Sequence, residues 1–487
     1  MKRVFSSPIL PLVAGAGLRL FFVLKFPAGA GDTGIYDQLA ANWLKHAQYA
    51  LDIAGQRVSV DIRMPGYPAF LAIVYAFAGQ TGEAASRAVL LAQAFVDLST
   101  CVLIGALAAL LALVCAEKAN ARRAFLVGLW LAALCPFTAN YAAVPLTEVW
   151  AVFFTALAML FLVAVIAQST GVSSLGQWPL TGSNYWLATA LAGFVVGLGT
   201  LFRPEAPLLL VTAFLILAVV LLRRGELKRF LLTVALMGFA AALPLVPWTI
   251  RNALTLHEFQ PLAPKDATLP GELVPKGFMA WEHTWLYRVR DCYLVSWKLN
   301  GEEIHLSDIP AAAFDTPEER DRVAAVLDTY NQDLTLTPEE DAAFAQLARE
   351  RTARHPLRTY LILPFKRAVR IWFTPRIELV PYSGNVFPLM YMGQVDPVDQ
   401  RVTILFFFLN VFYVALALCG AFRLCHSPAA RTALSLLLLY ILIRTAFLTT
   451  LETPEPRYVL VCFPALIALA AQLFLPRSLQ GFVTPPR

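Results

Sequence analysis

Residues 149–167 read VWAVFFTALAMLFLVAVIA, a run of 19 residues without a charge. A helix needs roughly 20 residues to cross about 30 Å of hydrocarbon, so this run is long enough to span a bilayer. Pro145-Leu146-Thr147-Glu148 precedes it, and Glu148 is the last carboxylate before the apolar residues. The stretch therefore predicts a transmembrane helix that begins near Glu148.

The composition extends this prediction to the whole chain of 487 residues. Hydrophobic residues make up 58% of it and charged residues 15%, whereas soluble domains lie near 45–50% and about 25%. The net charge of +6 is gathered in short loops between apolar runs, which argues against a nucleic-acid surface. Seven cysteines without a CxxC pair indicate neither a zinc site nor a disulfide framework.

About ten apolar segments are long enough, or nearly long enough, to cross a membrane. They lie at residues 8–25, 88–115, 124–142, 149–167, 186–202, 205–222, 230–250, 402–422, 432–450 and 458–475. The first imitates a signal peptide, because Lys2 and Arg3 precede it. Arg19 interrupts it, however, and no exported soluble domain follows, so we predict an uncleaved first span.

Another apolar segment, Gly66–Ala78, has only 13 residues and covers about 20 Å as a helix. It opens with the turn Pro65-Gly66-Tyr67-Pro68, so we predict a helix that lies along the membrane instead of crossing it. The basic loops at 118–123 and 223–229 then fall on the same side as both termini, as expected for the cytoplasm. The segments 26–87, 143–148, 203–205, 251–401 and 451–457 share the outer face.

The apolar segments divide the chain into three parts. We predict a transmembrane module at 1–255, an outer domain with a membrane-adjacent segment at 256–400, and C-terminal transmembrane helices at 401–487. In the outer domain, Thr316-Pro317-Glu318-Glu319 and Thr337-Pro338-Glu339-Glu340 are start signals for two helices, the second ending at about Arg354. The sequence thus predicts an all-α polytopic membrane protein with a small α-rich outer domain.

Two carboxylates stand where the outer loops meet the membrane. Asp32 lies in Gly31-Asp32-Thr33-Gly34-Ile35-Tyr36-Asp37, directly after the first span, where it could accept a proton from a hydroxyl. Its alternative role is to cap a helix at 33–45. Glu148 is the second candidate, and its alternative role is that of a helix N-terminal acid favoured by the dipole.

Arginines on the same face are candidates for binding a phosphate. Arg63 lies beside the 65–68 turn, with a snorkelling lipid anchor as the alternative. Arg203 lies in a short turn with Glu205, and an ion pair between the two is its alternative. Two more outer segments combine an arginine with an aromatic residue that also suits an interfacial belt, namely Trp248 with Arg251 and Tyr458 with Arg457.

Three charges lie inside predicted spans, namely Arg19, Asp97 and Arg444. Charged side chains are costly in hydrocarbon, so they are usually turned toward other helices and paired. We expect these three to hold helices together.

The order of the outer motifs resembles a known family. Gly-Asp-x-x-x-Tyr at 31–36 is followed by Arg-x-Pro-Gly-Tyr-Pro at 63–68, Pro-Leu-Thr-Glu at 145–148, Arg-Pro-Glu at 203–205, Pro-Trp-Thr-Ile-Arg-Asn at 247–252 and Glu-Pro-Arg-Tyr at 455–458. This order resembles the class-C glycosyltransferases, in the bacterial branch of glycosyltransferase family 39. That branch is related to protein O-mannosyltransferases and to the lipid A aminoarabinose transferase. The resemblance is strongest over 1–255 and weakest over 256–400.

The resemblance implies a GT-C fold whose first outer loop carries membrane-parallel helices, and a donor sugar carried on polyprenyl phosphate. It implies catalytic roles for Asp32 and Glu148. The family's lysine and double-proline turn is Arg63-Met64-Pro65-Gly66 here. No cofactor is implied, and a divalent metal is left open. The candidate substrate-binding residues are Tyr36, Asp37, Arg63, Arg203, Glu205, Arg251 and Arg457.

We therefore expect an inverting glycosyltransferase of the bacterial inner membrane. It would move a sugar to a lipid, glycan or protein hydroxyl on the outer face, with both termini in the cytoplasm and no nucleic-acid partner. The alternative is a transporter or flippase of a lipid-linked or anionic substrate. Such proteins usually have repeated halves and broken helices near the membrane centre, and the sequence gives no sign of either.

Overall fold

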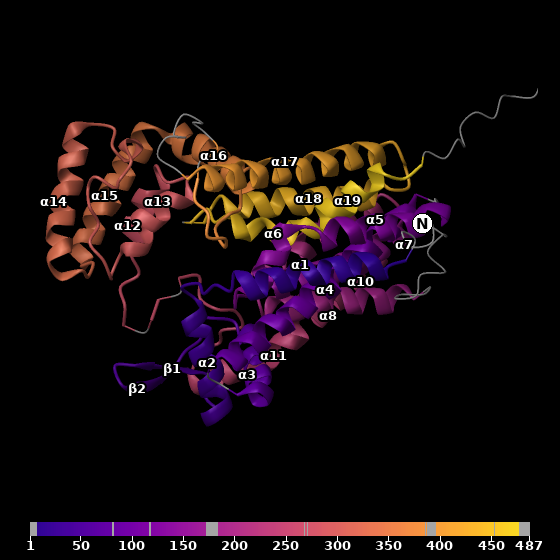
Figure 1. Cartoon of the computed structure of the whole chain (residues 1–487), viewed down its shortest axis with the longest axis horizontal. Coiled ribbons are helices and arrows are strands. Elements are labelled where there is room, and N and C mark those ends of the chain that lie inside the picture. Colours follow the sequence, from indigo (N-terminus) through magenta and orange to yellow (C-terminus); the bar gives the residue numbers. More distant parts are fainter. Residues whose placement is uncertain are drawn as a thin grey trace, which may run out of the picture. The chain divides into compact units, whose positions relative to one another are not determined.

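The computed structural model describes residues 7–79, 82–115, 118–171, 184–266, 268–269, 271–384, 386, 396–451 and 453–476. These residues are mostly helical (Figure 1). The predicted basic residues Lys2 and Arg3 lie outside them. The chain separates into two compact units, the first formed by Met1–Pro264, Pro375–Ile441 and Leu460–Arg487, and the second by Lys265–Thr374 and Leu442–Val459.

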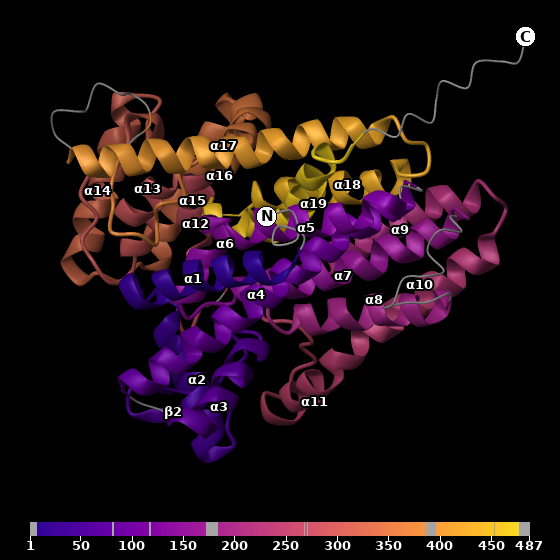
Figure 2. The same cartoon turned by 45° about the vertical axis from the view of Figure 1, so that its right-hand side comes forward.

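The first unit is built on helices that mostly run alongside one another (Figures 1 and 2). They are α1 (Ile9–Lys25), α4 (Glu83–Val114), α5 (Ala121–Ala133), α6 (Pro136–Ala139), α7 (Glu148–Ser169), α8 (Tyr185–Thr200), α9 (Leu208–Leu222), α10 (Leu227–Ala242), α17 (Pro397–Cys425), most of α18 (Arg431–Leu448) and α19 (Phe463–Leu473). Short 3-10 turns accompany them at η1 (Lys118–Asn120), η2 (Asn140–Ala143) and the end of η9 (Pro456–Cys462), whose first residues belong to the second unit.

Among the described residues, six helices are long and apolar enough to cross a membrane, or up to seven if one bent pair is a single span. The chain is therefore an integral membrane protein. Each of the ten predicted segments holds a helix or consecutive helices. Of these, α1 has 17 residues, α8 has 16 and α9 has 15, so each is shorter than a full perpendicular crossing.

The bent pair joins Ala121–Ala133 to Pro136–Ala143 at an angle of 54°. Cys135 at the break is extended, with φ −72° and ψ 109°. The ring of the following Pro136 disfavours the helical region for the residue before it, so the sequence itself places the bend.

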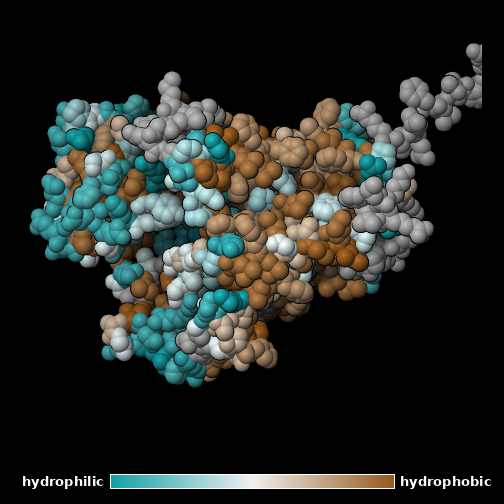
Figure 3. All heavy atoms as spheres, in the orientation of Figure 1, coloured by the Kyte–Doolittle hydropathy of each residue, from teal (hydrophilic) through white to brown (hydrophobic). Residues whose placement is uncertain are grey.

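The helices of the first unit carry an apolar surface, which Figure 3 shows in brown. Phe95 is 72% exposed, Leu405 63% and Phe422 69%. A water-soluble protein rarely exposes contiguous apolar patches of large size, whereas lipid tails contact such side chains without cost. This surface accords with helices that stand in a bilayer.

Inside the bundle, a buried ion pair connects three helices. Arg19 of α1 donates to Asp97 of α4 (Nε–Oδ2 2.8 Å) and to the carbonyl of Ala133 in α5 (2.7 Å). Both charged side chains are almost fully buried. The predicted packing role of Arg19 and Asp97 is confirmed.

The first loop forms α2 (Thr33–His46), a β1–β2 hairpin (Ala50–Ile53 and Gln56–Ser59) and α3 (Gly66–Ala78) at one end of these helices (Figure 1). Helix α3 has the predicted bounds. The antiparallel hairpin pairs Leu51 with Val58 and was not predicted. Its turn residues Ala54 and Gly55 have φ of 47° and 79°, as a two-residue turn between twisted strands requires.

The predicted segment 230–250 continues beyond its expected end. It begins as α10, tightens at η4 (Leu243–Leu245) and runs on as α11 (Val246–Thr255). Ile250 is 53% exposed and Leu254 74%, so one side of α11 remains apolar and open.

The second unit contains a small helical domain with its own core, in which Phe278, Trp281, Trp285 and Phe344 pack together. Thr316 accepts a hydrogen bond from the Glu319 amide, and Thr337 forms a capping box with Glu340, so both predicted start signals are confirmed. The elements are α12 (Lys276–His283), α13 (Val289–Leu294), η5 (Ser296–Lys298), η6 (Ala311–Ala313), α14 (Pro317–Asp333), α15 (Pro338–Arg354), η7 (Arg358–Ile362) and α16 (Leu363–Trp372).

Arg351 is fully buried in this domain and pairs with Glu319 (Nη1–Oε2 2.6 Å) and with Asp315 (3.3 Å). Burial alone would raise the pKa of each carboxyl. Hydrogen bonds and positive charge from Arg351, Arg354 and Arg358 outweigh burial, and both pKa values lie below their ordinary range. The ionised carboxylates therefore stabilise the domain above their unfolded pKa, and this contribution is lost as the pH falls through the lowered values.

We expect Glu319→Gln to destabilise the domain by about 3–5 kcal/mol, because it leaves the buried Arg351 charge short of a partner. The matched control is Glu350→Gln, whose partner Arg322 is 42% exposed, and it should cost less than about 1 kcal/mol. Amide hydrogen exchange of α15 in the solubilised protein measures both. Equal protection in the two variants would contradict a stabilising role for the buried pair.

Candidate functional site

The first unit brings together two carboxylates and two arginines. Arg63 donates to Asp32 (Nη2–Oδ1 2.7 Å), and Arg203 forms an ion pair with Glu148. All four charges lie close enough to act on the hydroxyl of Tyr36. Five predicted site residues thus form one cluster.

Asp32 directly precedes α2, yet its side chain makes no capping hydrogen bond to that helix. The capping role is therefore wrong, and Asp32 instead accepts from Arg63. The loop around it is held by backbone contacts, since the Ala28 amide donates to the Ala143 carbonyl (3.1 Å) and the Thr33 hydroxyl to the Pro145 carbonyl (3.3 Å). These bonds bring Asp32 next to the segment that leads into Glu148.

Glu148 is the first residue of α7, and its side chain is only 3% exposed. Arg203 reaches it from the turn between α8 and α9. The same guanidinium lies 3.8 Å from Glu205 (Nη1–Oε1), so the predicted pair within the turn is also present but is the longer of the two. One arginine therefore joins two loops that are distant in sequence.

Gly66 docks the turn that follows Arg63 against the turn that precedes Arg203. Its amide donates to the Leu201 carbonyl (2.7 Å), and a Cβ at this position would lie 2.6 Å from that oxygen. Trp150 of α7 strengthens the joint, since its ring centroid lies 5.1 Å from both Phe70 and Phe202. The two turns next to Arg63 and Arg203 are consequently held against each other.

Tyr36 lies near the four charged side chains and packs edge-to-face on Tyr67 (centroids 5.0 Å apart). Tyr67 donates to Gln93 (2.7 Å), and Gln93 donates to the Val144 carbonyl (2.8 Å). Burial and the nearby Asp32 raise the pKa of Tyr36 to about 12, although Arg203 and Arg63 oppose the shift. The hydroxyl therefore stays protonated at neutral pH and can donate a hydrogen bond.

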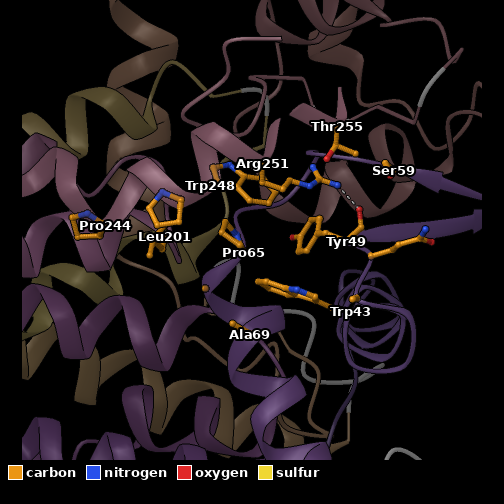
Figure 4. A pocket seen from close by; sticks show the side chains of 14 residues that line it. Trp43, Tyr49, Ser59, Pro65, Ala69, Leu201, Pro244, Trp248, Arg251 and Thr255 are labelled. Atoms are coloured by element: carbon orange, nitrogen blue, oxygen red, sulfur yellow. Dashed lines mark hydrogen bonds between the residues drawn. The ribbon is translucent and has the colours of Figure 1, made fainter. Parts of the chain in front are cut away.

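A pocket of about 540 Å³ includes Pro65, Gly66 and Leu201 in its wall, so it adjoins the turn that carries Arg63. Its remaining wall is largely aromatic and apolar, with Trp43, Tyr49, Ala69, Pro244, Pro247 and Trp248. Figure 4 shows Tyr49 between Trp43 and Arg251. Apolar walls with a few placed polar groups are typical of sites for amphipathic ligands.

Three predicted residues have partners elsewhere. Arg251 lines the pocket and donates to the carbonyls of Tyr49 (2.6 Å) and Val60 (2.9 Å), so it fixes the hairpin to α11. Asp37 accepts a hydrogen bond from Tyr75 of α3 (2.6 Å), and burial raises its pKa. Arg457 belongs to the second unit, where it pairs with Glu455 (Nε–Oε2 2.6 Å).

Sequence analysis missed the pocket. Trp43 and Tyr49 were not singled out, and Trp248 suited an interfacial belt, whereas the structure buries Trp248 to 5% exposure. The rings of Trp43 and Trp248 lie 5.3 and 4.9 Å from that of Tyr49. The available local signal was Ala54-Gly55, which marks a hairpin turn a few residues after Trp43 and Tyr49.

The described residues contain no group of three or more His, Cys, Asp or Glu side chains that could hold a metal ion. Asp32 and Glu148 each face an arginine instead. Each of these two carboxylates is thus compensated by an arginine side chain.

No family model matches the chain, and no curated protein matches it in sequence. Its structure is similar to the oligosaccharyltransferase AglB from Archaeoglobus fulgidus in complex with an inhibitory peptide and a dolichol-phosphate, with TM-score 0.46 and 13% identity over 96% of this chain and 50% of that chain. It is also similar to ArnT from Cupriavidus metallidurans bound to undecaprenyl phosphate, with TM-score 0.38 and 15% identity over 95% of this chain and 77% of that chain. The chain thus spans about half the length of the oligosaccharyltransferase. At these identities, its function has to rest on its own residues.

We expect Gly66→Ala to lower stability by about 1–3 kcal/mol, because the added methyl group has to displace the Leu201 carbonyl. Gly34→Ala is the matched control, since a Cβ at Gly34 would meet nothing within 4 Å. Thermal unfolding of the two purified variants against the parent measures the difference. Identical unfolding of all three proteins would contradict the tight contact.

Proposed function

We propose that the chain is a membrane glycosyltransferase that transfers a sugar from a polyprenyl-phosphate carrier to an acceptor hydroxyl. The observation that carries this proposal is the cluster in which Asp32 pairs with Arg63 and Glu148 pairs with Arg203 around Tyr36. A carboxylate supplies a base, and two arginines supply positive charge for a phosphate. The neighbouring apolar pocket supplies room for the lipid part of such a donor.

The two arginines of the cluster would bind the phosphate of the donor. A phosphate would draw the guanidinium groups of Arg63 and Arg203 toward itself, because both form strong, directional hydrogen bonds to phosphate oxygens. The Tyr36 hydroxyl would donate a further hydrogen bond. The first isoprene units would lie against Trp43, Tyr49 and Trp248, and the exposed apolar side of α11 supports lateral entry of the chain from lipid.

Transfer would then proceed as one displacement. The acceptor oxygen attacks the anomeric carbon, the bond from that carbon to the phosphate oxygen breaks, and the acceptor proton moves to Asp32. Arg63 and Arg203 stabilise the negative charge on the departing polyprenyl phosphate. Because Arg63 leaves Asp32 for the phosphate, the carboxylate becomes more basic when the donor is bound. Glu148 keeps Arg203 in position and orients the acceptor, and a single displacement inverts the anomeric centre.

The proposal also includes the membrane, the orientation of the chain and the kind of acceptor. The chain would act in a bacterial inner membrane, with both termini in the cytoplasm and the cluster on the outer face. The acceptor would be a lipid, a glycan or a protein. Transfer by purified protein in detergent, without any gradient, would separate the enzyme from a transporter or flippase.

We expect Asp32→Asn to lower the transfer rate by about 10²–10⁴-fold, because the amide cannot accept the acceptor proton. The amide keeps the size of the carboxylate and its oxygen can still accept the hydrogen bond from Arg63, so membrane insertion should remain near that of the parent and the unfolding temperature should fall only slightly. A labelled polyprenyl-phosphate sugar and separation of the products measure transfer. Full activity in a well-folded Asp32→Asn protein would end the proposal for this base.

Arg203→Lys should weaken donor binding. Lysine retains the positive charge that pairs with Glu148, but it lacks the planar guanidinium that forms bidentate hydrogen bonds to a phosphate. We expect KM for the donor to rise at least tenfold, about 1.4 kcal/mol, while KM for the acceptor changes little. Arg57→Lys is the control, because its partner Asp52 is 42% exposed and lies on the hairpin. An equal rise in both KM values would contradict the phosphate role.

A further inference from the structure

Helix α16 of the second unit has one face fixed to the protein. Leu363, Arg367 and Ile371 recur every four residues, and each is less than 5% exposed. Arg367 donates to three carbonyls, those of Leu286 (2.9 Å), His283 (2.9 Å) and Thr449 (3.2 Å). A helix held by three backbone acceptors cannot readily roll to hide its other face.

The opposite face is apolar and open. Phe365 is 69% exposed and Val369 40%, and Leu361 in the adjoining η7 is 65% exposed; the three residues recur every four positions. Lys366 and Arg370 form an exposed row directly beside them. An apolar row with a basic border is typical of helices that lie in a membrane surface.

The contacts of α16 place it beside the C-terminal end of α18, a helix that can cross a membrane. Trp372 donates to Thr445 (Nε1–Oγ1 2.9 Å), and Ile371 packs with Leu448. Both partners belong to the last turn of α18, which is long and apolar enough to cross a membrane. Side chains beside the last turn of a span lie where hydrocarbon meets headgroups.

Basic residues on and near α16 would favour anionic lipid headgroups at this face. Two cations lie over the Tyr287 ring, namely Lys366 (Nζ to centroid 5.2 Å) and Arg288 (Cζ to centroid 5.1 Å). Arg288, Arg290 and Arg370 all lie close enough to act on the buried Asp291 carboxylate. Three arginines therefore lie near one acid, and Lys366 beside Tyr287 adds a fourth cation. Clusters of about four Lys and Arg side chains attract anionic lipid headgroups.

We propose that the exposed face of α16 docks on anionic phospholipid at the membrane surface. Leu361, Phe365 and Val369 enter the boundary of the hydrocarbon, while Lys366 and Arg370, with Arg288 and Arg290, bind phosphate groups. The partner is the bilayer itself and not the donor or acceptor of the transfer reaction. The inference does not depend on that reaction.

The first experiment measures depth in the bilayer. A spin label is attached through Phe365→Cys in the full chain, with Cys419→Ser and Cys425→Ser removing the exposed native thiols. In phosphatidylcholine nanodiscs, the label should collide more with oxygen and less with a water-soluble nickel chelate than one attached through Gln332→Cys, an exposed position on α14. Equal access of the chelate to both positions would overturn the docking and point to a protein partner or to open solvent.

The second experiment tests the charge. Addition of phosphatidylglycerol should further exclude the chelate from position 365. The double variant Lys366→Gln and Arg370→Gln should remove that gain. Each lost cation should lower the docking equilibrium constant by about five-fold. The control pair Arg320→Gln and Arg349→Gln removes the same amount of charge elsewhere in the domain. In this control, phosphatidylglycerol should still increase the exclusion of the chelate. Amide exchange of α15 reports that each variant is folded. No effect of phosphatidylglycerol on the parent would overturn the preference for anionic lipid.

Discussion

The contact between the Gly66 amide and the Leu201 carbonyl is the joint on which the candidate site depends. It fixes the turn after Arg63 against the turn before Arg203, although the two lie in separate loops. Each arginine holds a carboxylate from another segment, Asp32 in one case and Glu148 in the other. Four segments that are distant in sequence are thereby brought into register by one backbone hydrogen bond and the aromatic packing around Trp150.

In both ion pairs, an arginine compensates the negative charge of a carboxylate that is partly or fully buried. Charges withdrawn from water are costly unless a partner is close, and here each acid is compensated by one arginine. The cluster is thus compensated without a ligand. In the proposed function, a phosphate would take the place of a carboxylate as the partner of an arginine, and the arginine would move from one anion to another without losing its partners.

Local signals predicted much of this molecule. The bounds of α3 followed from apolar length and the Pro65-Gly66 turn, and the starts of α14 and α15 followed from Thr-Pro-Glu-Glu sequences. The bend at Pro136 is also a local effect, although the segment was expected to be one span. These features depend on residues within a few positions of one another, so a single sequence contains the information.

The site was predicted in its residue types and less well in its pairings. The sequence indicated that Asp32, Arg63, Glu148 and Arg203 share a face, but spacing alone could not tell that Arg63 binds Asp32 and Arg203 binds Glu148. Asp32 as a helix cap was equally good local chemistry, and a long-range partner overrode it. The aromatic pocket and the use of Arg251 as a clamp on the hairpin depend on contacts between residues roughly 200 positions apart (separations of 202 to Tyr49 and 191 to Val60), which no local pattern encodes.

The Arg19–Asp97 pair has a consequence for how the chain is made. The two residues are separated by 78 positions, so the ribosome has to synthesise α2, the hairpin and α3 before Asp97 emerges. Until then, α1 carries an unpaired guanidinium that costs about 2.5–3.5 kcal/mol at the centre of a helix entering the membrane. The cost falls once α4 supplies Asp97, so the pair favours insertion of α1 together with α4 over insertion of α1 alone.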